Sequence, residues 1–409
     1  MNCISSDAAI AADVVDHLLS DQGRAALATL AQADLSASRT LTLLDGLRQT
    51  FAPAVAGALL SQARLRQRAA AKFPFAGQLF FTGEALEQAT AWPVALHRAG
   101  WIDRHAPPGP LLDLGCGIGG DTLALAQQRP VIAIDSDPLR LRFAQANAET
   151  LGLAGRVTFL HADWTALRAA GQLPPAAAAF ADPARRTAAG RIFHLHQMQP
   201  PIAELLRLHA QTPALGVKVM PGVQDAELPP GCGVEFVSHA GVCKEAVLWF
   251  GPLAQHRRWA SVHTAEGWEE IVNDGAIPPL GALQAGLWLH EPDPAVIRAG
   301  ALAPLCARLG AWLFDPQIAY LVSATPKWDR LVRSFRVHEV HRFSLKLLNQ
   351  RLQARGIGDV ELKKRGFPTE PESLRPRLKL TPGGAPAVIL FTRQGDQRLM
   401  LIAERARSG

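Results

Sequence analysis

Three glycines at alternate positions follow a short apolar run and precede a helix-forming segment. Leu111–Leu114 is long enough for a buried strand, Gly115, Gly117 and Gly119 come directly after it, and the residues from Asp121 suit a helix start. Such a turn lets a ligand approach bare backbone, where N–H groups and the helix dipole favour a carboxylate or a phosphate. The spacing therefore predicts a ligand site at this turn.

Two cofactors compete for this turn. Gly115, Gly117 and Gly120 satisfy the G-x-G-x-x-G pattern of dinucleotide-binding enzymes, which alone is a weak signal. Residues 113–120, Asp-Leu-Gly-Cys-Gly-Ile-Gly-Gly, resemble motif I of class I S-adenosylmethionine-dependent methyltransferases, and the acid two places before the first glycine favours that cofactor. A nicotinamide site and an ordinary glycine-rich turn stay open as alternatives. The resemblance implies cofactor contacts for Asp113, Gly115, Cys116, Gly117 and Gly119.

Acidic residues end the next two predicted strands. Val131–Asp135 is an apolar run, and Asp135 lies 22 residues after Asp113, the spacing at which a carboxylate accepts both hydroxyls of a bound ribose. A surface loop acid is the alternative. Residues 157–163 form the third predicted strand, and Asp163 resembles the family acid that hydrogen-bonds the adenine amino group.

A fourth predicted strand ends in Asp182-Pro183-Ala184-Arg185. In the resembling family this position lies beside the transferable methyl, and many amino-methylating members have Asp/Asn-Pro-Pro-aromatic there. The resemblance predicts that Asp182 orients the nucleophile or accepts its proton, with the Pro183 carbonyl as a second acceptor. Ala184 and Arg185 depart from the motif and argue against base amino methylation. Arg185 could instead stack on a base or pair with a phosphate, and a tight turn with solvated arginines is the alternative.

Strand and helix patterns alternate from residue 109, which predicts a Rossmann-like doubly wound α/β sheet. The resemblance implies seven strands in the order 3-2-1-4-5-7-6, closed by an antiparallel hairpin. We predict an N-terminal helical region (1–100), a class I methyltransferase core (101–252), a connecting α+β region (253–330) and a basic α+β domain (331–409).

Composition limits the class of protein. The chain has 409 residues, 48% hydrophobic and 19% charged, which suits two or three globular domains. No apolar run reaches the roughly 18 to 20 residues of a membrane span, and the first residues lack signal-peptide features. The five cysteines show no Cys-x-x-Cys spacing, and His290, Glu291 and Asp293 suit a capped turn better than a metal site. We therefore expect a cytoplasmic protein without metal or membrane partner.

Basic charge is concentrated at the end of the chain. Residues 331–409 hold 16 Lys and Arg against 7 Asp and Glu, a net charge of +9, so the remaining 26 basic and 29 acidic residues give −3. Within this segment Lys363, Lys364 and Arg365 are the predicted RNA contacts, with Phe367 as a core residue or a base-stacking one. A solvated surface, or docking on the acidic remainder of the chain, is the alternative. A second basic group, Arg64 to Lys72, suits a solvated helix face better than a polyanion site.

The whole arrangement is similar to an uncharacterised bacterial group of class I methyltransferases with a THUMP-like C-terminal domain. The shared elements include the glycine loop, Asp-Pro-Ala-Arg-Arg (182–186), Glu-Pro-Asp-Pro (291–294) and Lys-Lys-Arg-Gly-Phe (363–367). Because THUMP domains bind structured RNA, the resemblance implies a methyltransferase acting on transfer or ribosomal RNA, and a distant likeness to trimethylguanosine synthase points the same way. A protein or small-molecule methyltransferase, and a binding protein with a vestigial cofactor fold, stay open.

Overall fold

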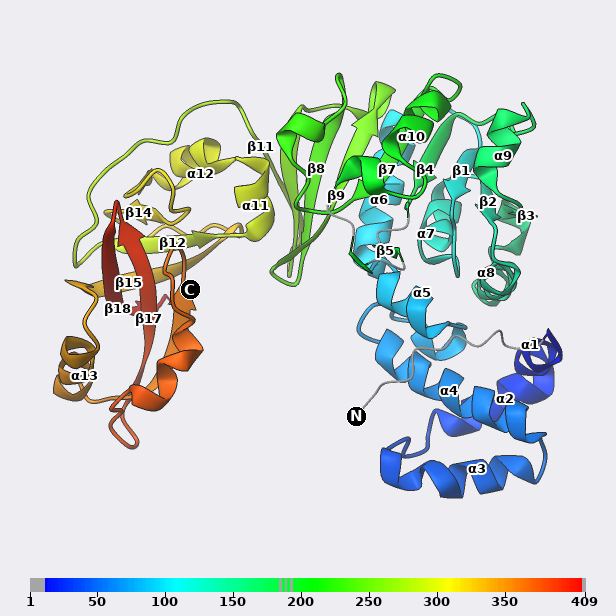
Figure 1. Cartoon of the computed structure of the whole chain (residues 1–409), viewed down its shortest axis with the longest axis horizontal. Helices are drawn as coiled ribbons and strands as arrows, with labels where there is room; N and C mark the ends of the chain where they lie inside the picture. Colours follow the sequence, from blue (N-terminus) through cyan, green and yellow to red (C-terminus); the bar gives the residue numbers. More distant parts are fainter. Residues whose placement is uncertain (1–11, 184–185, 188–189, 192–193, 407–409) are drawn as a thin grey trace. The chain divides into compact units, whose positions relative to one another are not determined.

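The computed structural model describes residues 12–183, 186–187, 190–191 and 194–406 (Figure 1). The chain forms two compact units, which are described separately. The first comprises Met1–Cys232 with Leu248–Gln255, and the second comprises Gly233–Val247 with His256–Gly409. Within the described residues, no helix is long and apolar enough to cross a lipid bilayer.

The first unit begins with the predicted helical region. Its helices are α1 (Ala12–Leu19), α2 (Asp21–Leu30), α3 (Thr40–Arg48), α4 (Pro53–Ala69), α5 (Gly83–Gln88) and α6 (Trp92–His105). Side-chain oxygens start two of them, because Ser20 accepts the Gly23 N–H at α2 and Thr82 accepts the Ala85 N–H at α5. Proline in the first turn starts α4 and α6.

The central sheet contains the predicted apolar strands. They are β1 (Leu111–Leu114), β2 (Val131–Asp135), β3 (Val157–His161), β4 (Ala178–Ala181), β7 (Ala214–Val219), β8 (Gly233–His239) and β9 (Val242–Phe250). The helices along this stretch are α7 (Gly120–Gln128), α8 (Pro138–Thr150), α9 (Trp164–Ala169) and α10 (Ile202–His209). Every residue of β1, β4 and β7 is buried, as expected for a parallel sheet covered on both faces.

The strand order β3-β2-β1-β4-β7-β9-β8 matches the predicted order of seven strands. The expectation that a hairpin closes the sheet is wrong, since β10 (Arg258–Thr264) pairs in parallel with β8, and β11 (Gly267–Val272) pairs antiparallel with β10. Trp259 and Ala260 of β10 are fully buried. An added strand thus covers the backbone groups that β8 would otherwise expose at a sheet edge.

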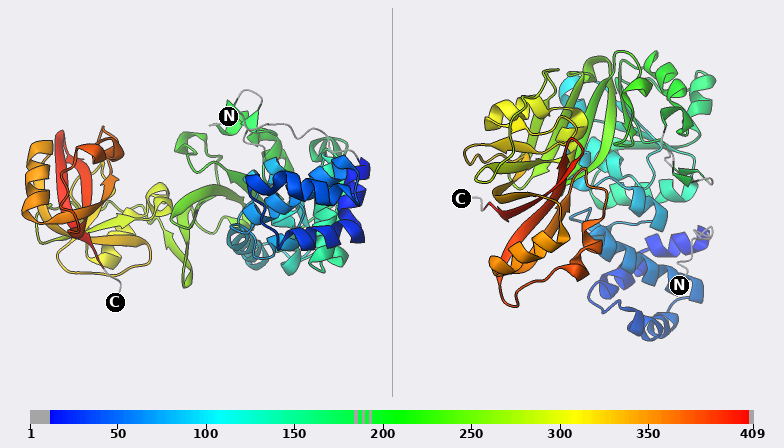
Figure 2. Two further views of the ribbon diagram at one scale, coloured as in Figure 1. Left: turned by 90° about the horizontal axis from the view of Figure 1, so that it is seen from below. Right: turned by 60° about the vertical axis from the view of Figure 1, so that its left-hand side comes forward.

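The second unit forms a seven-stranded sheet of its own. Its strand order is β13 (Trp312–Leu313), β14 (Leu321–Ser323), β12 (Trp288–Pro292), β15 (Val332–Arg342), β18 (Gln397–Arg405), β17 (Ala385–Gln394) and β16 (Ile357–Lys364). Helices α11 (Pro294–Ala299), α12 (Leu302–Leu309) and α13 (Leu345–Ala354) accompany it (Figure 2). The prediction of an α+β C-terminal domain is confirmed.

Both faces of this second sheet are buried. Along β17, Val388 and Leu390 belong to one apolar cluster, whereas Ile389 and Phe391 belong to another that includes Leu348 of α13. The alternation follows from the period-2 geometry of a strand.

One buried carboxyl joins a strand to a helix across the glycine loop. Asp113 lies in β1, is 2% exposed, and accepts a hydrogen bond of 2.5 Å from the Thr122 hydroxyl of α7. Burial, reinforced by the charge of Asp121, raises the pKa of Asp113 to about 7. Between pH 3.8 and about 7, the folded protein therefore holds a proton on Asp113 that the unfolded chain has already released.

This carboxyl should make stability depend on pH. Its stabilising contribution is fully present below its ordinary pKa of 3.8 and is lost as pH rises through about 7. Asparagine keeps an oxygen for Thr122 but cannot titrate. From pH 5 to 7.5, the wild-type free energy of unfolding should therefore fall by about 2 kcal/mol relative to Asp113→Asn. Urea unfolding of both proteins measures this difference, and parallel pH profiles would contradict the assignment.

Candidate active site

The shape of the glycine loop between β1 and α7 depends on backbone conformations that favour glycine. Gly115, Gly117 and Gly119 have φ values of 77°, 57° and 87°, in the left-handed region where other residues are strained. A Cβ on Gly119 would lie 3.4 Å from the Ala144 Cβ, whereas a Cβ on Gly117 would meet no atom within 4 Å. Gly117 therefore faces open space, and a ligand can approach the peptide there.

Asp135 is fixed at the end of β2 beside this loop. One carboxylate oxygen accepts the Gly117 N–H at 2.7 Å, and the other accepts the Asp137 N–H at 2.8 Å. Each oxygen has a second lone pair for a further donor. The side chain is 8% exposed, so its orientation is set by these two backbone bonds. The arrangement suits a carboxylate that receives two hydroxyl groups from a ligand.

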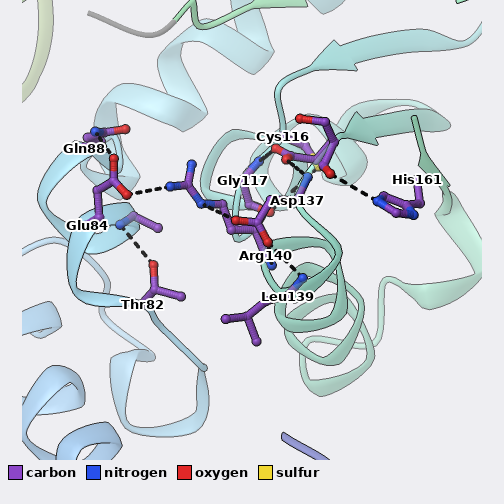
Figure 3. Close-up of polar contacts among 12 residues, drawn as sticks. Thr82, Glu84, Gln88, Cys116, Gly117, Asp137, Leu139, Arg140 and His161 are labelled. Carbon is purple, nitrogen blue, oxygen red and sulfur yellow. Dashed lines mark hydrogen bonds and ion pairs between the residues drawn. The ribbon is translucent and has the colours of Figure 1, made fainter. Parts of the chain in front are cut away.

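An ion-pair bridge connects α5 with the start of α8 (Figure 3). Arg140 of α8 donates to Glu84 of α5 at 2.7 Å and lies 3.3 Å from Asp137, whose carboxylate caps α8 by accepting the Leu139 N–H at 2.9 Å. The bridge therefore joins the helical region to the segment that follows β2. Figure 3 also shows His161, whose ring nitrogen contacts the Ser136 carbonyl at 3.1 Å.

Asp163 and Cys116, two further predicted cofactor contacts, occupy different environments. Asp163 caps α9, and its hydrogen bond from the Thr165 hydroxyl lowers its pKa. Because β3 pairs with β2, Asp163 follows the strand next to Asp135. Burial raises the pKa of the Cys116 thiol well above its ordinary value, so Cys116 can contribute backbone but not a thiolate nucleophile. The cofactor contacts of both residues remain predictions.

Asp182 lies at the end of β4, which pairs with β1. Its backbone oxygen lies 3.8 Å from the position that a Gly115 Cβ would take, so Asp182 directly adjoins the glycine loop. The carboxylate forms an ion pair of 2.6 Å with Lys218 of β7, which is 5% exposed, while Asp182 is 28% exposed. Asp182 therefore combines a partly accessible carboxylate, paired with the buried Lys218, with a backbone that adjoins the predicted cofactor loop.

The ion pair continues into a buried polar chain. The Lys218 ammonium also donates to the Thr90 hydroxyl at 2.9 Å, and that hydroxyl donates to Asp121 at 3.1 Å. Asp121, at the start of α7, pairs with the buried Arg98 of α6. No role for Lys218 or Arg98 was predicted from the sequence, although a lysine inside the apolar run 214–219 was a detectable signal. One strand, two helices and the segment between α5 and α6 thus support the position of one carboxylate.

The remaining residues predicted to act on the substrate do not share one environment. Pro183 is buried directly after Asp182, and Arg185 lies outside the described residues. In the second unit, Lys363 pairs with Glu291 at 2.6 Å and Arg365 lies 3.9 Å from the same carboxylate. The neighbouring Lys364 pairs with Glu370. RNA contact by the three residues remains a prediction.

Phe367 belongs to the core of the second unit. It is 5% exposed, and its ring lies 5.0 Å from that of Phe343 in an edge-on arrangement. The core interpretation is therefore confirmed.

Two groups of potential metal ligands differ in how close their ligand atoms lie and in which other groups they contact. Both ring nitrogens of the buried His290 contact serine hydroxyls at 2.8 Å, and Asp293 caps α11, which agrees with a capped turn. In the first unit, His194, His196 and Glu227 bring potential ligand atoms within 4.8 Å of one another. The sequence did not indicate this group, because Glu227 is 31 residues from His196.

Comparisons with known families divide the chain into recognisable segments. Residues 109–195 match the family described as RNA cap guanine-N2 methyltransferase, and residues 332–405 match the family described as THUMP domain-like. Residues 11–69 match a domain of unknown function. The first match contains the glycine loop, Asp135, Asp163 and Asp182.

Relatives extend over nearly the whole chain. An uncharacterised S-adenosylmethionine-dependent methyltransferase of Mycobacterium tuberculosis is 36% identical over 356 residues, which are 82% of this chain and 92% of that protein. Trimethylguanosine synthase of Schizosaccharomyces pombe is 39% identical over 54 residues, 13% of this chain and 23% of that protein. The crystal structure of a putative methyltransferase from Porphyromonas gingivalis has the same fold, with a TM-score of 0.72 at 18% identity over 95% of this chain and 99% of that one. The chain therefore belongs to the S-adenosylmethionine-dependent methyltransferases.

Proposed function

We propose that this protein transfers a methyl group from S-adenosylmethionine to a nucleophilic atom of an RNA. The observation that carries the proposal is the position of Asp182, whose backbone adjoins Gly115 of the cofactor loop and whose carboxylate is held by Lys218. The acceptor side of the site and the cofactor side thus meet at the carboxyl ends of β4 and β1, where open α/β sheets bind ligands.

The cofactor loop fits the adenosine part of S-adenosylmethionine. Space beside Gly117 admits a ligand to the backbone, and the Asp135 carboxylate can accept two ribose hydroxyls while keeping both of its N–H donors. Asp163 follows the neighbouring strand, where it could receive the adenine amino group. These three features come from different strands, and all lie on the carboxyl side of the sheet.

RNA is the substrate class that the family comparisons support. The segment with the cofactor loop and Asp182 matches a family described by RNA cap guanine-N2 methylation, and the second unit contains a THUMP domain-like segment. A protein or small-molecule acceptor has no comparable support in this chain. A vestigial cofactor fold is disfavoured because two N–H groups hold the Asp135 carboxylate beside the glycine loop, and each of its oxygens has a lone pair left for a ligand hydroxyl.

The residues of the site supply alignment rather than covalent chemistry. S-adenosylmethionine, when bound, supplies a methyl group on a sulfonium that leaves readily. The Asp182 carboxylate accepts a hydrogen bond from the nucleophilic atom of the substrate and can take its proton. The Pro183 carbonyl is the second hydrogen-bond acceptor for that atom. Lys218 is a positioning residue that fixes the Asp182 carboxylate through the 2.6 Å ion pair.

Cofactor affinity should depend on Asp135. Asp135→Ala removes hydrogen bonds to two ribose hydroxyls, each contributing about 1.5–3 kcal/mol with a charged acceptor, and should weaken S-adenosylhomocysteine binding at least about 100-fold. Asp137→Ala is the matched control, because its carboxylate caps α8, and it should change affinity less than about threefold. Calorimetry measures both values. Tighter binding of NAD than of S-adenosylmethionine would overturn the cofactor assignment.

Asp182 should act in transfer and not in cofactor binding. Asp182→Asn should lower kcat by roughly 10²–10⁴-fold, the usual contribution of a general base, and leave cofactor affinity within about threefold. Lys218→Met should lower kcat by roughly tenfold or more, and Lys218→Arg should restore part of it. Single-turnover methylation and calorimetry separate the two effects. Parallel loss of affinity and activity in Asp182→Asn would mean that this residue is structural.

The RNA substrate is tested by comparing modified nucleosides. Mass spectrometry of transfer and ribosomal RNA from a deletion strain, its parent and a strain with Asp182→Asn should show one methylated nucleoside present only in the parent. Purified protein should restore this nucleoside on RNA from the deletion strain. Unchanged RNA in all three strains, with a methylated protein or metabolite missing instead, would refute the RNA assignment.

A further inference from the structure

The second unit contains a cavity that the proposed methyl transfer does not use. Its volume is about 260 Å³, and its walls include Glu291–Pro294 between β12 and α11, Arg330–Arg333 at the start of β15, and Arg365 after β16. Two of the sequence motifs noted above, Glu-Pro-Asp-Pro and Lys-Lys-Arg-Gly-Phe, thus meet at one cavity, although their first residues, at positions 291 and 363, are 72 residues apart.

Arg333 is an exposed cation at the wall of the cavity. Its side chain is exposed, and in the described part of the chain its guanidinium makes no hydrogen bond and no ion pair within 4 Å. One terminal nitrogen lies at the β8–β9 turn, where a Cβ on Gly241 would be 2.7 Å away. Because Gly241 has no side chain, the Arg333 guanidinium can pack closely against this turn while its N–H donors remain unused.

Two further arginines line the same space. Arg330 lies 3.7 and 3.9 Å from its nearest carboxylates, beyond the usual length of a hydrogen bond. Arg365 lies over the Tyr320 ring at 5.0 Å, and its buried Nε has no hydrogen-bond partner among the described residues. Guanidinium donors from three segments therefore remain available to a ligand.

The acidic residues of the cavity are held by other groups. Glu291 pairs with Lys363 at 2.6 Å. Asp293 accepts the Ala295 N–H at 2.8 Å and the Ser238 hydroxyl at 2.9 Å, and burial raises its pKa. Glu291 also lies 3.9 Å from Arg365, and the charge of Arg333 acts on Asp293, so the two carboxylates offset part, but not all, of the charge of the three arginines.

We propose that this cavity binds the phosphate of a nucleotide, with Arg333 as its principal contact and Arg330 and Arg365 beside it. Planar guanidinium groups match phosphate oxygens in pairs, which a lysine cannot do. The volume lies slightly below the roughly 300–1,000 Å³ range of sites for drug-sized ligands, which suits a smaller ligand such as a phosphate with its sugar. Assignment of this nucleotide to an RNA rests on the function proposed above, whereas phosphate binding does not.

Calorimetry on the full chain tests phosphate binding. With S-adenosylhomocysteine saturating the cofactor site, uridine 5′-monophosphate should bind at least tenfold more tightly than uridine. Arg333→Ala should weaken the monophosphate at least tenfold. The matched control is Arg336→Ala, which removes the same charge from the opposite face of β15, where Arg336 lies over the Trp288 ring, and it should stay within twofold. No preference for the monophosphate, or equal losses in both variants, would overturn the proposal.

The salt dependence of transfer RNA binding identifies the source of the phosphate. If the nucleotide belongs to RNA, Arg333→Ala should reduce the slope of log K against log salt by about 0.7 to 0.9, the contribution of one phosphate, and Arg336→Ala should not. An unchanged slope with weakened monophosphate binding would refute the RNA source and leave a free nucleotide as the ligand. Failure of RNA methylation alone would refute the proposed function, because monophosphate binding is measured without it.

Discussion

The active site depends on a backbone loop that cannot hold itself in place. Gly115, Gly117 and Gly119 adopt left-handed conformations and have no side chains with which to anchor the loop. Two carboxyls from neighbouring strands do this instead. Asp113 holds the start of α7 through Thr122, and Asp135 accepts the N–H of Gly117. The loop can therefore present bare peptide to a ligand because its anchors come from β1 and β2, which are part of the rigid sheet.

The helical region is part of this support and not a separate module. Asn147 of α8 pairs with both backbone groups of Phe80 and donates to the Ile118 carbonyl within the glycine loop. Lys72 donates to three carbonyls at the end of α5. The basic group that suggested a solvated helix face is therefore partly internal, since Arg66 is also buried against the Leu79 carbonyl and burial lowers its pKa to about 10. The helical spacing of this segment correctly predicted a helix, but its positive charge did not reveal which basic side chains are buried.

The parts of the fold that the sequence predicted are those with a local physical cause. Apolar runs such as Val131–Asp135 form buried strands at the predicted residues, and the glycine spacing marked the loop. The pairing of β10 with β8, and the extension of the sheet by β11, were not predicted, because strand pairing depends on partners distant in the chain. Lys218 was a comparable case: its type was visible, but its contacts with Asp182 and Thr90 join residues 36 and 128 positions away. Long-range polar pairing leaves no periodic signal in a sequence.

Net charge is a poor guide to where the second unit meets an anion. Two of the three consecutive basic residues that dominate its sequence pattern are already paired with acidic side chains, Lys363 with Glu291 and Lys364 with Glu370, whereas Arg365 lies 3.9 Å from Glu291. Arg333, which belongs to no basic run, has its donors unused in the described part of the chain. A charge that is already paired must lose its partner before it contacts a phosphate, whereas an unpaired guanidinium loses only water. Arg333, rather than the run of three basic residues, is thus the stronger candidate for recognising an anionic substrate.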